Sequence, residues 1–315
     1  MQETSAGQEA TGTTAIGRAV RVVSLNFRIG SKRLDEVTSI VDSEGARGCD
    51  LIALPETWMG SAPQQVDDPT VTTLAEIARR HHTYLVCPIY RWDGAQCLNS
   101  AILIDRQGEI ACIYDKVYPY WSEFELKPPV QTGSDVPVYA ADFGRVGMAI
   151  CFDVNFPQVW QRLADQGAEL VIWPSAYSAG SSLQAHAINH HFAIVTATST
   201  GDCQVYDITG ERILDEHNES LNVSRITLDL DRGIYHENFN LEKRDRLLLE
   251  RGDDVMQEKE MAREEWFILK AKRAGVSARA LAREYGLEEL RDYLHRSRRE
   301  IDHMRGLKVG AHNRG

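Results

Sequence analysis

Short apolar runs alternate with amphipathic helical segments from Val20 to about residue 230. The runs VRVVSLNF (20–27) and CDLIALPE (49–56) have the length of buried strands, and the segment between them has helical spacing of its apolar residues. The same rhythm continues with a predicted helix at 70–82 and a predicted strand at 84–90. Strands that alternate with helices in this way are typical of layered α/β folds.

The predicted sheet is mixed. LNSAILID (98–105) and EIACIYDK (109–116) flank the turn Arg106-Gln107-Gly108, as the two strands of a hairpin would. A second strand-helix-strand series follows between residues 144 and 200. The economical architecture is therefore a layered α/β sandwich. Residues 1–18 lack periodicity and are predicted to be a flexible leader.

The character of the chain changes after Asp231. Residues 241–305 are rich in charge and lack Pro, and helical periodicity is present at 261–275 and 277–302. We therefore expect residues 236–315 to form a helical C-terminal extension. Part of it superficially resembles a helix-turn-helix, but the nearly balanced charges of the region disfavour contact with phosphates. Packing or a subunit contact is the favoured role.

Composition excludes several partners. The 35 Lys and Arg against 46 Asp and Glu give a formal net charge of −11, which disfavours nucleic acids and anionic membranes. No apolar run approaches the roughly 20 residues of a membrane span, and the N-terminal segment lacks the features of a signal peptide. We expect a cytoplasmic protein. Its six cysteines show no CxxC pairing, so free thiols are expected rather than disulfides or metal clusters.

Three predicted strands end in reactive side chains, namely Glu56, Lys116 and Cys151. Strand ends are where α/β folds present catalytic groups to a common crevice. A thiol with an ordinary pKa near 8.5 is mostly protonated at neutral pH, so a nucleophilic cysteine needs a base and a positive field. Glu56 and Lys116 could supply these. The three residue types together predict an acyl-transfer site.

The segments around these residues carry a family resemblance. LPETW around Glu56, YDKVYPYWSE around Lys116 and GMAICFDVNFPQVW around Cys151 stand in the order and with the wide separations of the nitrilase superfamily of carbon–nitrogen hydrolases. The chain resembles this family over roughly residues 19–235. The resemblance implies an α/β fold of the nitrilase type, a four-layer α-β-β-α sandwich, to which the helical extension is added.

The resemblance also implies a thioester mechanism without a cofactor or metal. Cys151 would attack the substrate carbonyl, Glu56 would carry the proton, and Lys116 with the backbone N–H of Phe152 would stabilise the oxyanion. Glu123 matches the family spacing K-x-x-P-x-x-x-E after Lys116 and is predicted to be the second carboxylate. Glu125 is the alternative.

The residues after the nucleophile indicate the substrate class. Cys151-Phe152-Asp153 is similar to the Cys-x-Asp pattern of amidases and N-carbamoyl hydrolases, whereas nitrile-cleaving members tend to show Cys-Trp-Glu. We expect hydrolysis of a small amide or N-carbamoyl compound that releases ammonia or amine. The alternatives are a nitrilase and a non-enzymatic scaffold or regulator that uses its tail. By resemblance, a homo-oligomer is implied, and the predicted substrate contacts are Phe152, Trp173, Ser175 and Tyr177.

Two further features favour structural roles. His186, His190 and His191 share a predicted helix at a spacing that can bind zinc. No carboxylate or cysteine nearby completes such a site, so packing or surface positions are expected and no metal is predicted. Asp153 is expected to accept hydrogen bonds that shape the turn of the nucleophile.

Overall fold

The computed structural model describes residues 15–307 and divides into two compact units. Among these residues, the larger unit comprises Val20–Leu230 together with 290–307, and the smaller unit comprises Asp231–Glu289 together with 15–19. The predicted leader lies mostly in residues 1–14, outside the described residues. The predicted domain boundary after residue 235 stays a prediction.

Two sheets build the larger unit. The first has seven strands in the order β13-β1-β2-β3-β4-β5, with β6 paired to β4. The contacts of β1, β2 and β3 are parallel, whereas β3, β4 and β5 are antiparallel, as the hairpin pattern predicted. The strands are β1 (Ala19–Asn26), β2 (Leu51–Ala53), β3 (Tyr84–Trp92), β4 (Cys97–Ile104), β5 (Ile110–Asp115), β6 (Val130–Gln131) and β13 (Asn222–Asp229).

The second sheet has six strands in the order β12-β11-β10-β9-β8-β7. Strands β8, β9 and β10 are parallel to one another, and the strands at both edges are antiparallel to their neighbours. The strands are β7 (Val138–Ala141), β8 (Gly144–Met148), β9 (Leu170–Ser175), β10 (Ala193–Thr198), β11 (Asp202–Tyr206) and β12 (Arg212–His217).

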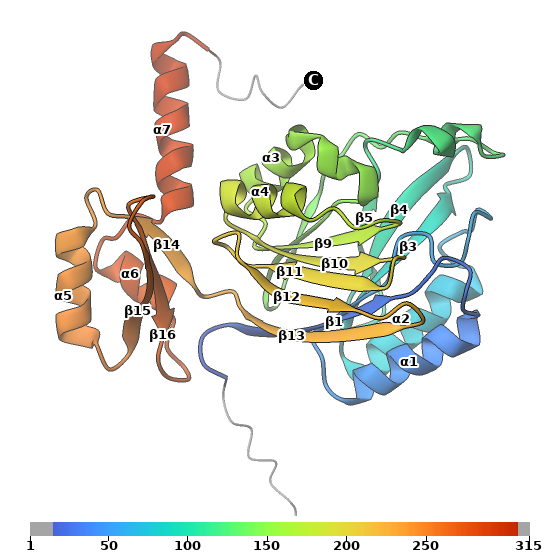
Figure 1. Ribbon diagram of the computed structural model, residues 1–315, viewed down its shortest axis with the longest axis horizontal. Helices are drawn as coiled ribbons and strands as arrows, with labels where there is room; N and C mark the ends of the chain where they lie inside the picture. The colour runs from blue at the N-terminus through green and yellow to red at the C-terminus, as the bar shows by residue number, and fades with distance from the viewer. Residues whose placement is uncertain (1–14, 308–315) are drawn as a thin grey trace, which may run out of the picture. The chain divides into compact units, whose positions relative to one another are not determined.

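The two sheets pack against each other and helices cover their outer faces (Figure 1). In β1, Val22 packs into the core shared by both sheets, while Val23 packs into a separate core with helices α1 (Leu34–Ala46) and α2 (Pro69–His81). Successive residues of a strand point to opposite faces, so a sheet buried on both sides needs the continuous apolar runs seen in the sequence.

The outer face of the second sheet is covered by helices α3 (Pro157–Asp165) and α4 (Ser181–His190). Trp160 of α3 and Leu183 of α4 are fully buried in the core of this sheet. The layers are thus helix, sheet, sheet and helix, and the predicted α-β-β-α sandwich is confirmed.

The smaller unit corrects one prediction. Residues 236–315 were expected to be helical, but β15 and β16 of this region form a three-stranded antiparallel sheet with β14, which begins before it, in the order β14-β16-β15. Its elements are β14 (Gly233–His236), α5 (Leu241–Arg251), β15 (Val255–Met261), β16 (Trp266–Ala271) and α6 (Ala278–Glu284). Phe267, Leu269 and Ala271 alternate along β16 into a core formed with α5 and α6. The expected helix at 261–275 is wrong because Val255–Met261 and Trp266–Ala271 pair as antiparallel strands, and local periodicity does not reveal this pairing.

Helix α7 (Leu290–Met304) belongs by its contacts to the larger unit. Arg291 donates to the carbonyl oxygen of Ala168 at 2.8 Å, and Arg298 pairs with Asp165 of α3. The helical periodicity predicted at 277–302 is therefore present as two helices, α6 and α7. Within residues 15–307, no helix has both the length and the apolar character that crossing a membrane requires.

Candidate active site

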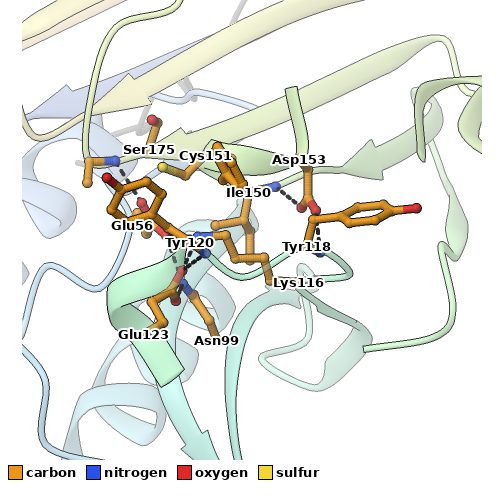
Figure 2. A network of polar contacts seen from close by, with 12 residues as sticks. Glu56, Asn99, Lys116, Tyr118, Tyr120, Glu123, Ile150, Cys151, Asp153 and Ser175 are labelled. Carbon is orange, nitrogen blue, oxygen red and sulfur yellow. Dashed lines mark hydrogen bonds and ion pairs between the residues drawn. The ribbon is translucent and has the colours of Figure 1, made fainter. Parts of the chain in front are cut away.

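The three reactive residues follow three strands of the two sheets. Glu56 comes after β2 and Lys116 directly after β5 of the first sheet, whereas Cys151 comes after β8 of the second sheet and opens the short 3₁₀ helix η2 (Cys151–Asn155). All three line one cavity of about 520 Å³, together with Glu123. Figure 2 shows these side chains gathered in one polar network. The convergence expected from the sequence is present in the structure.

Lys116 lies between two carboxylates. Its Nζ donates to Oε1 of Glu56 at 2.9 Å and to Oε2 of Glu123 at 2.6 Å, and only 1% of the residue is exposed. Burial alone would lower the pKa of Lys116, but the charges of Glu56 and Glu123 outweigh it and raise the pKa above its ordinary value. Lys116 therefore stays a cation. Glu125, the alternative second carboxylate, is exposed and does not line the cavity.

Glu123 is fixed by its own 3₁₀ helix, η1 (Trp121–Glu125). Its Oε2 also accepts the backbone N–H of Tyr120 at 2.6 Å, and the residue is only 5% exposed. The second carboxylate is thus held by the backbone as well as by Lys116.

Cys151 is buried at the start of η2 with a φ of +45°. Few residues other than Gly adopt this left-handed conformation, and it is costly unless the surroundings enforce it. The indole N–H of Trp173 donates to the carbonyl oxygen of Cys151 at 3.2 Å and is one such support. The nucleophile candidate therefore sits on a fixed, strained turn.

The protonation state of Cys151 follows from its surroundings. Burial, and then the charge of Glu56, raise the pKa of the thiol far above its ordinary value. Lys116 and hydrogen bonding to the Ala176 N–H and the Ser175 side chain act in the opposite direction but are weaker. The resting residue is a thiol, so its proton has to leave as the sulfur attacks. Glu56 lines the same cavity and is a carboxylate that can accept this proton.

Asp153 supports the same turn from inside the protein. Its carboxylate is fully buried and accepts the backbone N–H groups of Ile150 and Tyr118, both at 2.9 Å, and the hydroxyl of Tyr114 at 2.6 Å. Burial raises the pKa of Asp153 to about 6, even though these donors and Lys116 favour the charged form. Asp153 thus joins the turn of Cys151 to the loop after Lys116, as the structural role expected for it requires.

Asn99 is a site residue that the sequence analysis missed. Its Nδ2 donates to Oε1 of Glu56 at 2.8 Å and to Oε1 of Glu123 at 2.7 Å, so it bridges the two carboxylates. The residue lies in β4 and is fully buried. The available signal was a single amide within the apolar run LNSAILID, since a buried amide needs hydrogen-bond partners.

Comparisons with known proteins decide the family. The family model described as "Carbon-nitrogen hydrolase" matches residues 30–234, which include every residue of this network. The chain belongs to the carbon–nitrogen hydrolase family. The resemblance proposed from the three sequence motifs is therefore confirmed.

The proteins similar to this hydrolase include several amidases. It is 26% identical over 198 residues to a deaminated glutathione amidase of Synechocystis sp., covering 54% of this chain and 73% of that one. It is 23% identical over 252 residues to a citrullinase of Francisella tularensis, covering 67% and 88%. A solved amidase of Nesterenkonia sp. superposes with a TM-score of 0.59 at 23% identity, over 69% of this chain and 94% of that one, which shows the shared fold.

The predicted substrate contacts of the hydrolase divide into two groups. Phe152 and Tyr177 line the cavity, as do Tyr120 and Asn155, which the sequence analysis did not single out. Trp173 and Ser175 are fully buried on β9 and do not line it. Both contact residues that line the cavity. Trp173 donates to the carbonyl oxygen of Cys151, and Ser175 forms hydrogen bonds with the backbone of Tyr177 at 2.6 and 3.0 Å.

The histidines on α4 of the hydrolase have packing roles. His186 stacks on Trp160 with ring centroids 4.3 Å apart, and one of its ring nitrogens lies 2.9 Å from the carbonyl oxygen of Val154. Between residues 15 and 307, no group of three or more His, Cys, Asp or Glu side chains is arranged to hold a metal ion.

Proposed function

We propose that this hydrolase cleaves the C–N bond of a small amide through a thioester on Cys151. The observation that carries the proposal is the convergence of Cys151, Glu56 and Lys116 on one cavity. A thiol, a carboxylate and a fixed ammonium are the nucleophile, proton carrier and oxyanion partner that acyl transfer needs. The proposed mechanism has two halves.

In the first half, the sulfur of Cys151 attacks the amide carbon while its proton passes to Glu56. Oε1 of Glu56 already accepts from Asn99 and Lys116, whereas Oε2 accepts only the Ala176 N–H at 2.7 Å among the contacts of the described residues. Oε2 is therefore the oxygen that takes the proton. The carbonyl oxygen becomes an oxyanion beside the Lys116 ammonium. Glu56 then protonates the nitrogen, the C–N bond breaks, and ammonia or an amine leaves the thioester behind.

In the second half, a water molecule cleaves the thioester. Glu56, now ionised again, takes a proton from the water as its oxygen attacks the thioester carbon. Collapse of the second oxyanion breaks the C–S bond and releases the acid. The proton returns from Glu56 to the sulfur of Cys151, which restores the resting thiol.

An amide is the favoured substrate over a nitrile. Cys151-Phe152-Asp153 follows the amidase-like pattern, and the names of the relatives include amidases. A mutant of the Nesterenkonia amidase is described as showing covalent addition of the acetamide moiety of fluoroacetamide at its active-site cysteine. The same chemistry at Cys151 would support the proposal. An N-carbamoyl compound fits the same steps, and assembly into a homo-oligomer stays a prediction.

The test measures ammonia release from a panel of amides, N-carbamoyl compounds and nitriles. We expect turnover of amides, its loss in Cys151→Ala, and its retention in Cys112→Ala, where a half-buried thiol on β5 outside the cavity is removed. Fluoroacetamide should place one acetamide moiety on Cys151, as located by peptide mass spectrometry. Turnover that survives Cys151→Ala would refute the assignment, and turnover of nitriles but not amides would identify a nitrilase instead.

A further inference from the structure

The cavity is poorly suited to bind a charged group on the substrate. Within the described part of the chain, its charged lining residues are Glu56, Glu123 and Lys116, which sum to −1. Lys116 is paired with both carboxylates, at 2.9 and 2.6 Å, and Asn99 donates to both as well. A carboxylate that enters such a site loses hydration, and the one cation that lines the cavity among the described residues is already paired. An uncharged substrate avoids this penalty.

The walls of the cavity present aromatic rings to a ligand. Tyr120 and Tyr177 line it with exposed fractions of 53% and 36%, and Phe152 of η2 lines it as well. An apolar group that covers these rings removes their surface from water, and aromatic partners gain further from edge-to-face contacts.

These rings are held in place by other rings. Tyr120 meets Phe152 edge-to-face at 5.3 Å between centroids, and Phe152 meets Phe156 in the same way at 5.4 Å. Phe156 in turn stacks on Tyr118 at 3.7 Å. A wall that is ordered before the ligand arrives loses less freedom on binding.

The size of the cavity fits more than a small amide. At about 520 Å³ it falls within the range of about 300–1,000 Å³ typical of sites for drug-sized ligands. An acetamide molecule would leave most of this space and most of the aromatic wall uncovered.

From the charge, the rings and the size, we infer that the physiological substrate is an uncharged primary amide whose acyl group carries an aromatic ring. This inference rests on the proposed function, because it names the substrate of the same site. It selects against amides with a free carboxylate and against small aliphatic amides. The ring would lie against Tyr120, Phe152 and Tyr177.

The test of charge compares three amides with the same chain length, namely hexanamide, adipamate and 6-aminohexanamide. We expect kcat/KM for hexanamide to exceed that of each charged analogue by at least about tenfold. Ser122→Arg adds a cation at an exposed lining position of η1 and should raise the adipamate to hexanamide ratio at least about fivefold. Ser39→Arg, which adds the same charge on the exposed face of α1, is the matched control and should leave the ratio unchanged.

The test of the aromatic wall compares 3-phenylpropanamide with acetamide. We expect the phenyl substrate to have the higher kcat/KM by at least about tenfold in the unaltered protein. Tyr120→Ala should lower this ratio at least about fivefold, because the ring is lost while the backbone N–H to Glu123 remains. Trp121→Ala is the control, since Trp121 is the neighbouring residue, is 75% exposed and does not line the cavity.

The outcomes separate the inference from the function on which it rests. If none of these amides is hydrolysed, the proposed amidase function fails. If kcat/KM for adipamate or 6-aminohexanamide equals that for hexanamide, the amidase function stands and the inference is overturned. The same holds if kcat/KM for acetamide equals that for 3-phenylpropanamide. If Ser122→Arg and Ser39→Arg have the same ratio of kcat/KM for adipamate to kcat/KM for hexanamide, the role given to charge in the cavity is overturned as well.

Discussion

Asn99→Asp is the substitution that most directly tests how the two carboxylates are kept in place. It replaces the Nδ2 donor, which reaches Glu56 at 2.8 Å and Glu123 at 2.7 Å, with an oxygen of nearly the same size. The side-chain Oδ1 of Asn99 is buried and has no hydrogen-bond partner among the described residues. The effect of the change can therefore be assigned to the Nδ2 group.

The magnitude follows from two lost hydrogen bonds and one added charge. A hydrogen bond to a charged group contributes roughly 1.5–3 kcal/mol, so the two together amount to roughly 3–6 kcal/mol. Since about 1.4 kcal/mol corresponds to a tenfold rate change, kcat/KM at neutral pH should fall by about 10²- to 10⁴-fold. Three carboxyl groups would then surround one ammonium, which favours uptake of a proton by one of them.

This added proton predicts a distinctive pH dependence. The new carboxyl group can donate again once it is protonated, so the activity of Asn99→Asp should recover in part as the pH falls, relative to the unaltered protein measured at the same pH. Asn99→Ser lacks both the long donor and the added charge, so it should lose activity without the acid recovery. Asn222→Asp alters another buried Asn, which donates to the carbonyl of Glu216 outside the cavity, and controls for a buried charge in general.

The assay is kcat/KM for an amide across the pH range in which the fold is retained, with thermal unfolding measured in parallel. The reasoning would be refuted by Asn99→Asp with the rate and pH profile of the unaltered protein. An equal acid recovery in Asn99→Ser would refute it as well, since that variant carries no new carboxyl group.

Three other predictions concern the supports of the site and the stability of the fold. Glu123→Gln should lower kcat by at least about 10²-fold, because the Lys116 ammonium loses a buried partner. Glu125→Gln, at an exposed position, should change kcat by less than about twofold, and equal effects of the two variants in steady-state assays would contradict the choice of Glu123. Gly133→Ala should destabilise the protein by about 1–3 kcal/mol in denaturant titrations and lower kcat, since a Cβ there would lie 2.1 Å from the carbonyl oxygen of Asp115, the residue before Lys116. An unchanged free energy of unfolding would contradict this prediction. Burial lowers the pKa of His191 to about 4 in the folded state, against about 6.5 in the unfolded state. The neutral form of His191 therefore contributes up to about 3 kcal/mol of stability above pH 6.5, and this contribution is lost as the pH falls toward 4. His191→Asn should flatten the decline of Tm in that window, whereas His217→Asn, at an exposed position, should not.

The sequence was sufficient to predict the layers of the larger unit. Both sheets are buried on two faces, so their strands appear as continuous apolar runs, and helices such as α1 and α3 keep a clear apolar stripe. The positions of Glu56, Lys116 and Cys151 at strand ends could be predicted for the same reason. Their convergence needed no knowledge of loop geometry.

The sequence was not sufficient where the structure depends on long-range partners. The hairpin of β15 and β16 could not be told from a helix, because periodicity in a short charged segment does not reveal which neighbour covers it. Trp173 and Ser175 precede the lining residue Tyr177 by only a few positions, yet they face the interior of the fold. Asn99 could not be assigned to the site because its two partners lie 43 and 24 residues away along the chain.

The shared contacts of Lys116 have a consequence for measurements that combine substitutions. Lys116 and Asn99 each donate to both Glu56 and Glu123, so removing any one of the four takes a partner from two of the other three. Energetic effects within such a closed ring do not add. A double variant such as Lys116→Met with Glu123→Gln should therefore cost less than the sum of the two single variants, and the rate deficit of one variant cannot be assigned to one bond.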